Sequence, residues 1–393
     1  MSAFTDLRDL DAAHVMQTYG RLPVAFVRGE GTRLWDSEGR EYLDFLCGLA
    51  VTSLGHAHPR VAAAIAEQAA TLLHVSNLYY NDVQPRLAAA IDDLAGGGGR
   101  VFFANSGAEA NECAIKLARR HGQRNGGPER FHVVSAYRSF HGRTLTTLAA
   151  TGQPQKQETF QPLPPGFRQV EFGDLDALAA AMDDRVAAVL LEAVQAEGGV
   201  HPADDDYLRA VRQLCDEREA LLVFDEVQAG LGRTGEWFGF MHSGVVADAF
   251  TMAKALGNGV PIGACWARHD VAAAFAAGDH ATTFGGQPLA ARAALEVLAV
   301  MREEDVPARA RRAGARLASA LVALDGVESV RGLGLLLAAE LGDGRDAKAV
   351  AEACLANGLV VNAVTPTALR LTPPLLVSDD EIDAAVAILR EVL

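Results

Sequence analysis

The centre of the chain holds an acid and a lysine, each placed directly after a short apolar run. Asp225 follows Leu221–Phe224, and Lys254 follows Ala249–Ala253. Continuous apolar runs of this length are typical of strands that are covered on both faces. Ligands of open parallel sheets bind at the carboxyl ends of the strands, so we expect both side chains to meet a ligand there.

These two residue types together suit one kind of chemistry. Alone, the lysine could be a surface residue whose amine reaches water, or a desolvated amine of the kind that carbonyl chemistry through a Schiff base requires. Pyridoxal phosphate (PLP) needs both a lysine for its aldehyde and a carboxylate for its pyridinium nitrogen. The pair Asp225 and Lys254 therefore predicts a PLP site, in which the acid keeps the ring able to take up electrons.

A phosphate site is predicted upstream of this pair. The segment NSGAEANECAIKLARRHG follows a probable strand, Arg100–Ala104, and has the apolar spacing of a helix. Ser106 and Glu109 have the spacing of a capping box, which by itself would explain their types. In addition, Ser106, Gly107 and Ala108 offer a hydroxyl and backbone N–H groups at the positive end of the helix, where a phosphate can bind.

The segments FDEVQAGLGRTG and TMAKALGNGVPIGA resemble the signature of the class III, or omega-type, PLP-dependent aminotransferases, and the resemblance extends over nearly the whole chain. It implies an α/β protein of the fold type I PLP-dependent transferases: a three-layer α/β/α large domain with a mostly parallel sheet, and a small α+β domain from both chain ends. The implied boundaries are 1–50 for the N-terminal part of the small domain, 51–299 for the large PLP-binding domain and 300–393 for the C-terminal small domain. The implied reaction is reversible transamination. Lys254 would be linked to the cofactor before the substrate amine displaces it, and would then act as the base that moves the proton between substrate carbon and cofactor.

The resemblance also implies roles for residues around the cofactor. Phe140 would stack on its ring, Val227 would touch the other face, and Gln228 would touch its hydroxyl. Thr283 would reach the phosphate of the neighbouring subunit, which implies a homodimer with shared active sites. Without the resemblance, the segment around Thr283 could be a plain serine and threonine turn.

Three charged residues are implied to bind substrate. Arg143 would hold a carboxylate through its planar guanidinium. Arg370 would bind an α-carboxylate, and Glu197 would pair with a distant arginine and release it when the second substrate arrives. From the residues alone, Arg143 could be a solvated residue of an ordinary loop, Arg370 a residue of a surface strand, and Glu197 an ordinary solvated loop acid.

Four residues depart from the pattern of the family: Ala193, Ala196, Ala281 and Gln287. Ala196 replaces a glycine, and alanine does not easily adopt a positive φ. We therefore expect the loop around Glu197 to differ slightly.

Within the class, the segment FLCGLAVTSLGHAHP at residues 45–59 resembles the acetylornithine group and lacks a tyrosine that ornithine aminotransferases carry near this point. The resemblance implies that N-acetyl-L-ornithine and 2-oxoglutarate are converted to N-acetyl-L-glutamate 5-semialdehyde and glutamate, in arginine biosynthesis. Succinylornithine, free ornithine, 4-aminobutyrate and acyl-lysine remain alternative substrates. A dinucleotide-binding dehydrogenase would need a completed G-x-G-x-x-G after a strand, which is missing, and a binding protein without catalysis would not need Lys254.

Composition agrees with a protein that binds small molecules. The 393 residues are 50% hydrophobic and carry a net charge of −15, with 50 acids and 35 bases in no long single-sign block, so neither a nucleic-acid partner nor an anionic membrane is expected. The five cysteines form no C-x-x-C pair and predict buried thiols in a cytoplasmic protein. No metal-binding spacing is present, and no apolar run reaches the ~18 residues of a membrane span.

The elements expected to position these residues alternate along the chain. The N-terminal 50 residues predict extended segments, and the helix after Ser106 is expected to end before Gly122. A second group of helices and short strands is expected after residue 300. The principal predicted helices are 61–73, 84–94, 175–182, 205–217, 288–301, 306–324, 347–357 and 381–392, and the principal predicted strands are 131–135, 186–191, 262–266, 334–340 and 369–371.

Overall fold

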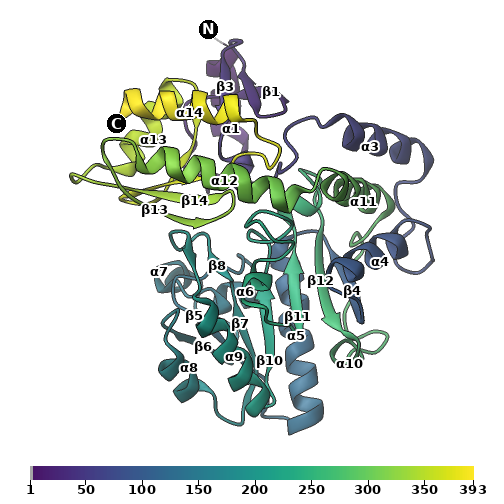
Figure 1. Ribbon diagram of the computed structural model, residues 1–393. Helices are drawn as coiled ribbons and strands as arrows, with labels where there is room; N and C mark the ends of the chain where they lie inside the picture. Colours follow the sequence, from purple (N-terminus) through teal and green to yellow (C-terminus); the bar gives the residue numbers. More distant parts are fainter. Residues whose placement is uncertain (1–2) are drawn as a thin grey trace.

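A seven-stranded sheet forms the centre of the computed structural model, which describes residues 3–393 (Figure 1). Its strand order is β4-β12-β11-β10-β7-β5-β6, and β12 runs opposite to both of its neighbours while the other pairs are parallel. A mostly parallel sheet is confirmed. The strands are β4 (Gly99–Ala104), β5 (His132–Ala136), β6 (Phe167–Val170), β7 (Val186–Leu191), β10 (Leu221–Asp225), β11 (Ala249–Met252) and β12 (Gly263–Arg268).

Helices cover both faces of this sheet because its strands are apolar on both sides. Along β10, Leu221 and Val223 join one hydrophobic cluster, whereas Leu222 and Phe224 join another. The first cluster contains the buried side of the long helix α5 (Gly107–Gly126), and the second contains that of α9 (Asp205–Glu217). Helix α8 (Leu175–Ala181) lies beside α9 in Figure 1, so the three-layer α/β/α architecture is confirmed.

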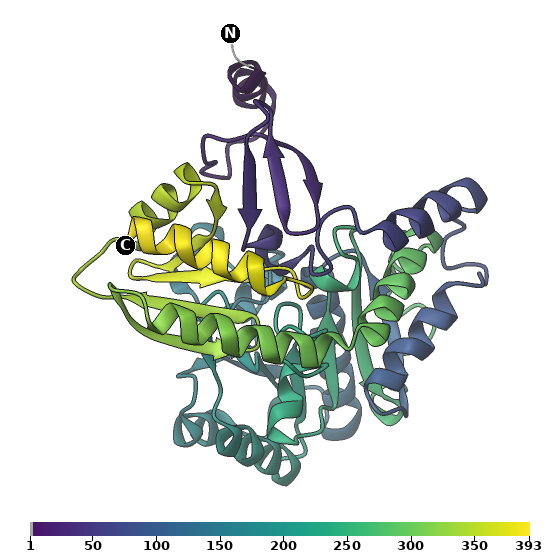
Figure 2. The same cartoon turned by 45° about the horizontal axis from the view of Figure 1, so that its top comes forward.

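The two ends of the chain meet beside this sheet. Strand β15 (Leu359–Val360) pairs in parallel with β3 (Glu41–Asp44), at the edge of a sheet that also contains β1 (Phe26–Glu30) and β2 (Arg33–Asp36). Figure 2 shows these N-terminal strands next to the C-terminal helices. A second antiparallel sheet, in the order β13-β14-β17-β16, contains β13 (Val327–Leu333), β14 (Leu336–Leu341), β16 (Asn362–Thr365) and β17 (Ala368–Leu371).

The remaining helices connect and cover these sheets. Helix α11 (Pro288–Glu303) packs on α3 (Pro59–Thr71) and α4 (Gln84–Leu94) and leads into α12 (Val306–Val322). The boundaries predicted at residues 50 and 300 stay predictions. The other elements are α1 (Ala3–His14), α2 (Cys47–Ala50), α6 (Leu145–Ala150), α7 (Pro154–Gln157), α10 (His269–Ala272), α13 (Ala347–Ala356), α14 (Asp379–Val392), β8 (Val194–Gln195) and β9 (His201–Pro202).

Two local predictions were wrong. The helix after Ser106 continues past Gly122 to Gly126, because Gly122 is buried against the chain rather than ending the helix: a Cβ there would lie 2.5 Å from the carbonyl oxygen of Arg130. The N-terminal segment contains the helix α1, where only extended structure was predicted. All five cysteines are free and buried, as predicted.

Candidate active site

Asp225 is the last residue of β10, and its buried carboxylate is held by three donors. Asn111 Nδ2 donates to Asp225 Oδ2 at 2.7 Å, His141 Nδ1 donates to the same oxygen at 2.8 Å, and Val227 N donates to Oδ1 at 3.1 Å. Thr251 Oγ1 donates to Asn111 Oδ1 at 2.8 Å, which fixes the orientation of the amide. Because a carboxylate has about four lone-pair sites, Asp225 can still accept a bond from a ligand cation.

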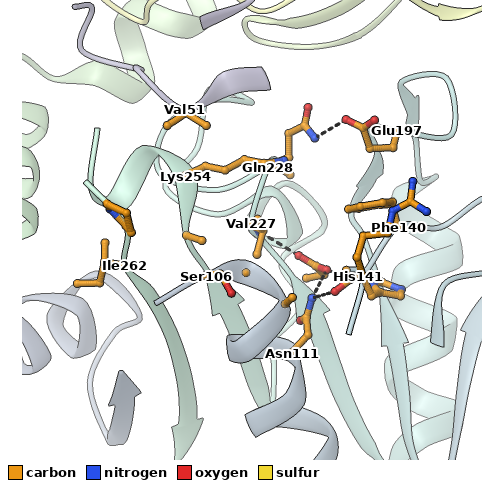
Figure 3. A pocket seen from close by; sticks show the side chains of 18 of the residues that line it. Val51, Ser106, Asn111, Phe140, His141, Glu197, Val227, Gln228, Lys254 and Ile262 are labelled. Atoms are coloured by element: carbon orange, nitrogen blue, oxygen red, sulfur yellow. Dashed lines mark hydrogen bonds and ion pairs between the residues drawn. The ribbon is translucent and has the colours of Figure 1, made fainter. Parts of the chain in front are cut away.

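Lys254 follows β11 and lies across the cavity from Phe140 (Figure 3). Its φ of 44° is in the left-handed region, which residues other than glycine adopt uncommonly. Burial lowers the pKa of Lys254 to about 8, and the charge of Arg370 acts in the same direction against the acids Glu197, Asp225 and Glu192. A substantial fraction of the amine is therefore neutral near neutral pH, and a neutral amine can attack a carbonyl carbon.

The N-terminus of α5 lies at the bottom of the same cavity. The hydroxyl of Ser106 accepts a bond from Glu109 N at 3.2 Å, while the Glu109 carboxylate accepts from Asn105 N rather than from Ser106, so the predicted reciprocal box is displaced by one residue. Gly107 has no room for a side chain, because a Cβ there would lie 2.8 Å from Val227 Cγ1. The first turn of the helix therefore approaches Val227 closely, and the backbone N–H groups of Gly107 and Ala108 lie where an anion could accept from them.

Phe140 forms one wall of the cavity, and its position is fixed from the backbone. Phe140 N donates to Glu192 Oε2 at 3.1 Å, and Glu192 is itself buried. Burial, and then the negative charge of Asp225, raise the pKa of Glu192 well above its ordinary value. The guanidinium of Arg143 lies 5.6 Å from the centre of the Phe140 ring, at the exposed edge of the wall.

A second charged group reaches the cavity from β17. Arg370 is 1% exposed and forms an ion pair with Glu197, 2.5 Å between Nη1 and Oε1. Gln228 links the two, because its Nε2 donates to Glu197 Oε1 at 3.1 Å and its Oε1 accepts from Arg370 Nη1 at 3.0 Å. Although burial alone would raise it, the charge and hydrogen bond of Arg370 lower the pKa of Glu197 to about 2. The acid is therefore ionised and neutralises Arg370 at any pH at which the protein works.

The cavity enclosed by these groups has a volume of about 390 Å³. Arg370 is not part of the lining and contacts it through Glu197 and Gln228. Thr283 is also outside it, exposed in a separate hollow beside Phe103 and Gly285, so the chain's own cavity does not contain it. The lining includes the other ten predicted residues: Ser106, Gly107, Ala108, Phe140, Arg143, Glu197, Asp225, Val227, Gln228 and Lys254.

Two of the four departures from the family pattern, Ala196 and Gln287, have clear packing or hydrogen-bonding partners. Ala196 does not have a positive φ, and its buried methyl group packs in a small cluster with Val200 and Ala368. The side chain of Gln287 accepts a bond from Leu289 N at 2.9 Å and so caps α11. The methyl group of Ala196 therefore fills space beneath the loop that carries Glu197.

Sequence reasoning missed several residues of the site. Asn111 and His141 hold Asp225, Glu192 holds Phe140, and Val51, from the segment 45–59, lies in the lining. Asn111 lies one helical turn from the predicted phosphate site, so helical spacing could have placed it at the cavity. Glu192 directly follows the apolar strand β7, the same signal that identified Asp225.

The residues present fit PLP. The carboxylate of Asp225 has room to accept a bond from a protonated ring nitrogen, the helix terminus at Gly107 suits a phosphate, and the amine of Lys254 is suited to an aldehyde. Within residues 3–393, no group of acids, histidines and cysteines could hold a metal ion. In the same range, no helix is long and apolar enough to cross a membrane.

Comparison with known proteins agrees with this site. The family model described as "Aminotransferase class-III" matches residues 15–393. The chain is similar to an acetylornithine aminotransferase of Methanocaldococcus jannaschii, with 48% identity over 98% of this chain and 97% of that protein. Among solved structures, it is similar to the ornithine aminotransferase of Toxoplasma gondii with PLP partially occupying its active site (34% identity, TM-score 0.95, 100% and 94% of the two chains). It is also similar to the N-acetylornithine aminotransferase of Stenotrophomonas maltophilia (36% identity, TM-score 0.84, 98% and 97% of the two chains).

Proposed function

Because this chain belongs to the class III aminotransferases, which are PLP-dependent enzymes of fold type I, we propose that it transfers the terminal amino group of N2-acetyl-L-ornithine to 2-oxoglutarate. The products are N-acetyl-L-glutamate 5-semialdehyde and L-glutamate, as in arginine biosynthesis. The relatives named acetylornithine aminotransferase support this substrate. The observation that carries it in the structure is the ion pair between Glu197 and Arg370.

We propose that PLP is held by residues from three segments. Asp225 binds the ring nitrogen, Phe140 and Val227 flank the ring, and Gln228 keeps one N–H of its amide for the ring hydroxyl. Ser106, Gly107 and Ala108 bind the phosphate. When bound, PLP supplies an aldehyde that accepts the substrate's amine and a ring that takes up the electrons released as a C–H bond breaks.

The side chains of the protein then perform the proton transfer and the orientation. Lys254 Nζ would remove a proton from the carbon that bears the amine and deliver it to the carbon on the far side of that nitrogen, for which its lowered pKa is suited. Asn111 and His141 orient the Asp225 carboxylate, because each donates a hydrogen bond to it. Together, Lys254, Asn111 and His141 favour loss of the proton over other reactions of the bound amine.

The two arginines allow one cavity to bind two substrates. N2-acetylornithine has a single carboxylate, which binds Arg143, while Glu197 neutralises Arg370. Glutamate has two carboxylates, so its distal carboxylate binds Arg143 and its α-carboxylate replaces Glu197 at Arg370. This exchange places the terminal amine of one substrate and the α-amine of the other at the same point near Lys254.

We further propose a cytoplasmic homodimer in which each chain completes the partner's site. Thr283 is exposed and lies outside the cavity of its own chain, which supports a role in the partner's phosphate site. Leu78, which lines the same hollow, is 84% exposed, and the adjacent Tyr80 is fully exposed. Apolar side chains exposed together in this way suit an interface between two copies. The five free thiols support a reducing compartment.

The test of this function is a panel of amino donors assayed with 2-oxoglutarate, in which glutamate formation is measured. We expect N2-acetylornithine to give the highest kcat/KM among acetylornithine, succinylornithine, ornithine, 4-aminobutyrate and N-acetyl-lysine. A higher value for ornithine or 4-aminobutyrate would overturn the proposed substrate and leave the aminotransferase chemistry standing.

A further inference from the structure

Two cations share one aromatic ring at the edge of the cavity. The guanidinium carbon of Arg143 lies 5.6 Å from the centre of the Phe140 ring, and the Nζ atom of Lys156 lies 5.4 Å from it. Lys156 belongs to the short helix α7 and is half-buried, whereas Arg143 belongs to the loop before α6. The sequence patterns gave Lys156 no role, and it comes to the site only because α7 packs beside the Phe140 wall.

Neither cation is neutralised by the protein. Over the residues that the structure describes, Arg143 and Lys156 form no ion pair or hydrogen bond with a carboxylate. Glu197 is an acid whose charge acts on Lys156, but its Oε1 atom is bonded to Arg370 and Gln228. Burial, and then the charge of Arg143, lower the pKa of Lys156, which is the effect expected of two like charges left close together.

An anion bound between the two cations would remove this repulsion. Cation–π contact with Phe140 offsets only part of it, since such contacts stabilise by about 0.5–1 kcal/mol at exposed sites. A carboxylate has two oxygens, so it can accept bonds from a planar guanidinium and from an ammonium at the same time. Both donors lie at similar distances from the centre of the Phe140 ring. Phe140 itself lies on the same side of the cavity as Glu197 (Figure 3).

We propose that Lys156 is a substrate-binding residue that, together with Arg143, holds the carboxylate of the substrate at the mouth of the cavity. The inference rests on the proposed function, in which each substrate places a carboxylate at Arg143. That group is the α-carboxylate of N2-acetylornithine in one half-reaction and the distal carboxylate of glutamate or 2-oxoglutarate in the other. Lys156 therefore acts equally on both half-reactions and selects against amines that lack a carboxylate.

The experiment compares the holoenzyme with its variants Lys156→Met and Lys156→Arg. Lys156→Met keeps the alkyl chain and removes the charge, and Lys156→Arg keeps the charge. Lys348→Met is the matched control, because Lys348 is an exposed lysine on α13 whose nearest acid, Glu352, is 4.0 Å away. The substrates are N2-acetylornithine, 2-oxoglutarate and N-acetyl-1,4-diaminobutane, which is acetylornithine without its carboxylate.

We expect Lys156→Met to raise KM for both N2-acetylornithine and 2-oxoglutarate by about tenfold, with kcat within about twofold, as for the loss of one charge-assisted hydrogen bond that stabilises both ground and transition states. Lys156→Arg should restore most of the affinity, and Lys348→Met should change nothing. Single-turnover rates with N-acetyl-1,4-diaminobutane should be the same in the wild type and in Lys156→Met, because that amine offers no anion to lose.

Three results would overturn the proposal. Unchanged KM values in Lys156→Met would show that Lys156 binds no substrate. An equal loss with N-acetyl-1,4-diaminobutane would show that Lys156 only supports Phe140. A loss confined to one half-reaction would contradict a shared carboxylate position. If the wild type does not use N2-acetylornithine at all, the proposed function fails separately, and KM for 2-oxoglutarate with the best donor still tests Lys156.

Discussion

Replacing Glu197 by glutamine tests how the cavity distinguishes its two substrates. The pKa of Glu197 is lowered from 4.5 to about 2, which at 1.36 kcal/mol per unit corresponds to roughly 3 kcal/mol favouring the charged form. Arg370 supplies the largest part of this stabilisation, and Lys254 and Gln228 share the rest. We therefore assign about 2 kcal/mol to the ion pair, which is about 30-fold in a rate constant. The side chain of Glu197 is only 26% exposed, so solvent screens this pair weakly.

In Glu197→Gln, Arg370 keeps its hydrogen bonds to Gln228 and Asn362 but loses the charge that neutralises it. The freed arginine then competes with Arg143 for the single carboxylate of N2-acetylornithine. We expect kcat/KM of that half-reaction to fall about 30-fold, while the glutamate half-reaction stays unchanged or becomes faster. Rapid-mixing absorbance measurements of each half-reaction separately provide the two values.

The control is Glu340→Gln, because Glu340 forms a comparable pair with Arg331, 2.7 Å away and 25% exposed, on β14 and outside the cavity. It should change neither half-reaction. Equal losses in both half-reactions of Glu197→Gln, at an unchanged melting temperature, would refute the switch and leave Glu197 as a support for its loop.

Three further predictions concern the cofactor. Apoenzyme should capture PLP at a rate that rises with pH and is half-maximal near pH 8 rather than near 10.5, because burial lowers the pKa of Lys254 and only the neutral amine reacts; stopped-flow absorbance measures this rate. Borohydride reduction followed by peptide mapping should find the label on Lys254 and no label in Lys254→Ala. A label on another residue would contradict the assignment. Asp225→Asn should reduce kcat by orders of magnitude and also lower the melting temperature. If the new amide oxygen accepts from Asn111 and His141, its NH2 group faces the donor Val227 N. Full activity would remove the role of the acid. Thr283→Ala should weaken PLP retention, which equilibrium dialysis measures. Mixing the Thr283→Ala protein with the Lys254→Ala protein should produce hybrid dimers in which one of the two sites is intact. Absence of activity from this mixture would argue against sites shared between subunits.

The sequence was sufficient to predict what local pattern encodes. Asp225 and Lys254 each end an apolar run, and the position of a polar residue after such a run already places it at a ligand-binding edge. Glu192 carries the same signal, but no role was predicted for it. The ends of α4 and α9 were also predicted correctly, because their apolar spacing stops where the helices stop. Gly122 misled the prediction, because a glycine that permits close packing inside a helix has the same sequence signature as one that ends it.

What depends on packing could not be predicted in this way. The contact between Asn111 and Asp225 joins residues 114 positions apart, and nothing in the pattern around either residue specifies it. The same is true of Lys156, which lies near Phe140 only because the chain folds back through α6 and α7. The family resemblance supplied Arg143, Glu197 and Arg370, but not the fact that Gln228 is bonded to two of these three.

The charges of the cavity differ in sign from those of the whole chain. The protein has a net charge of −15, yet the cavity and its edge bring together four basic residues, Arg143, Lys156, Lys254 and Arg370, and, besides Glu192, only two acids, Asp225 and Glu197. Burial, and then the charge of Asp225, raise the pKa of Glu192, which disfavours a further negative charge there. PLP, 2-oxoglutarate and glutamate are all anions, so they are repelled by the distant surface and attracted only within the cavity. Because salt screens distant charges more than buried ones, moderate ionic strength should weaken the repulsion first and the attraction later. Capture of these anions therefore depends on the enclosed cations rather than on the field of the whole protein.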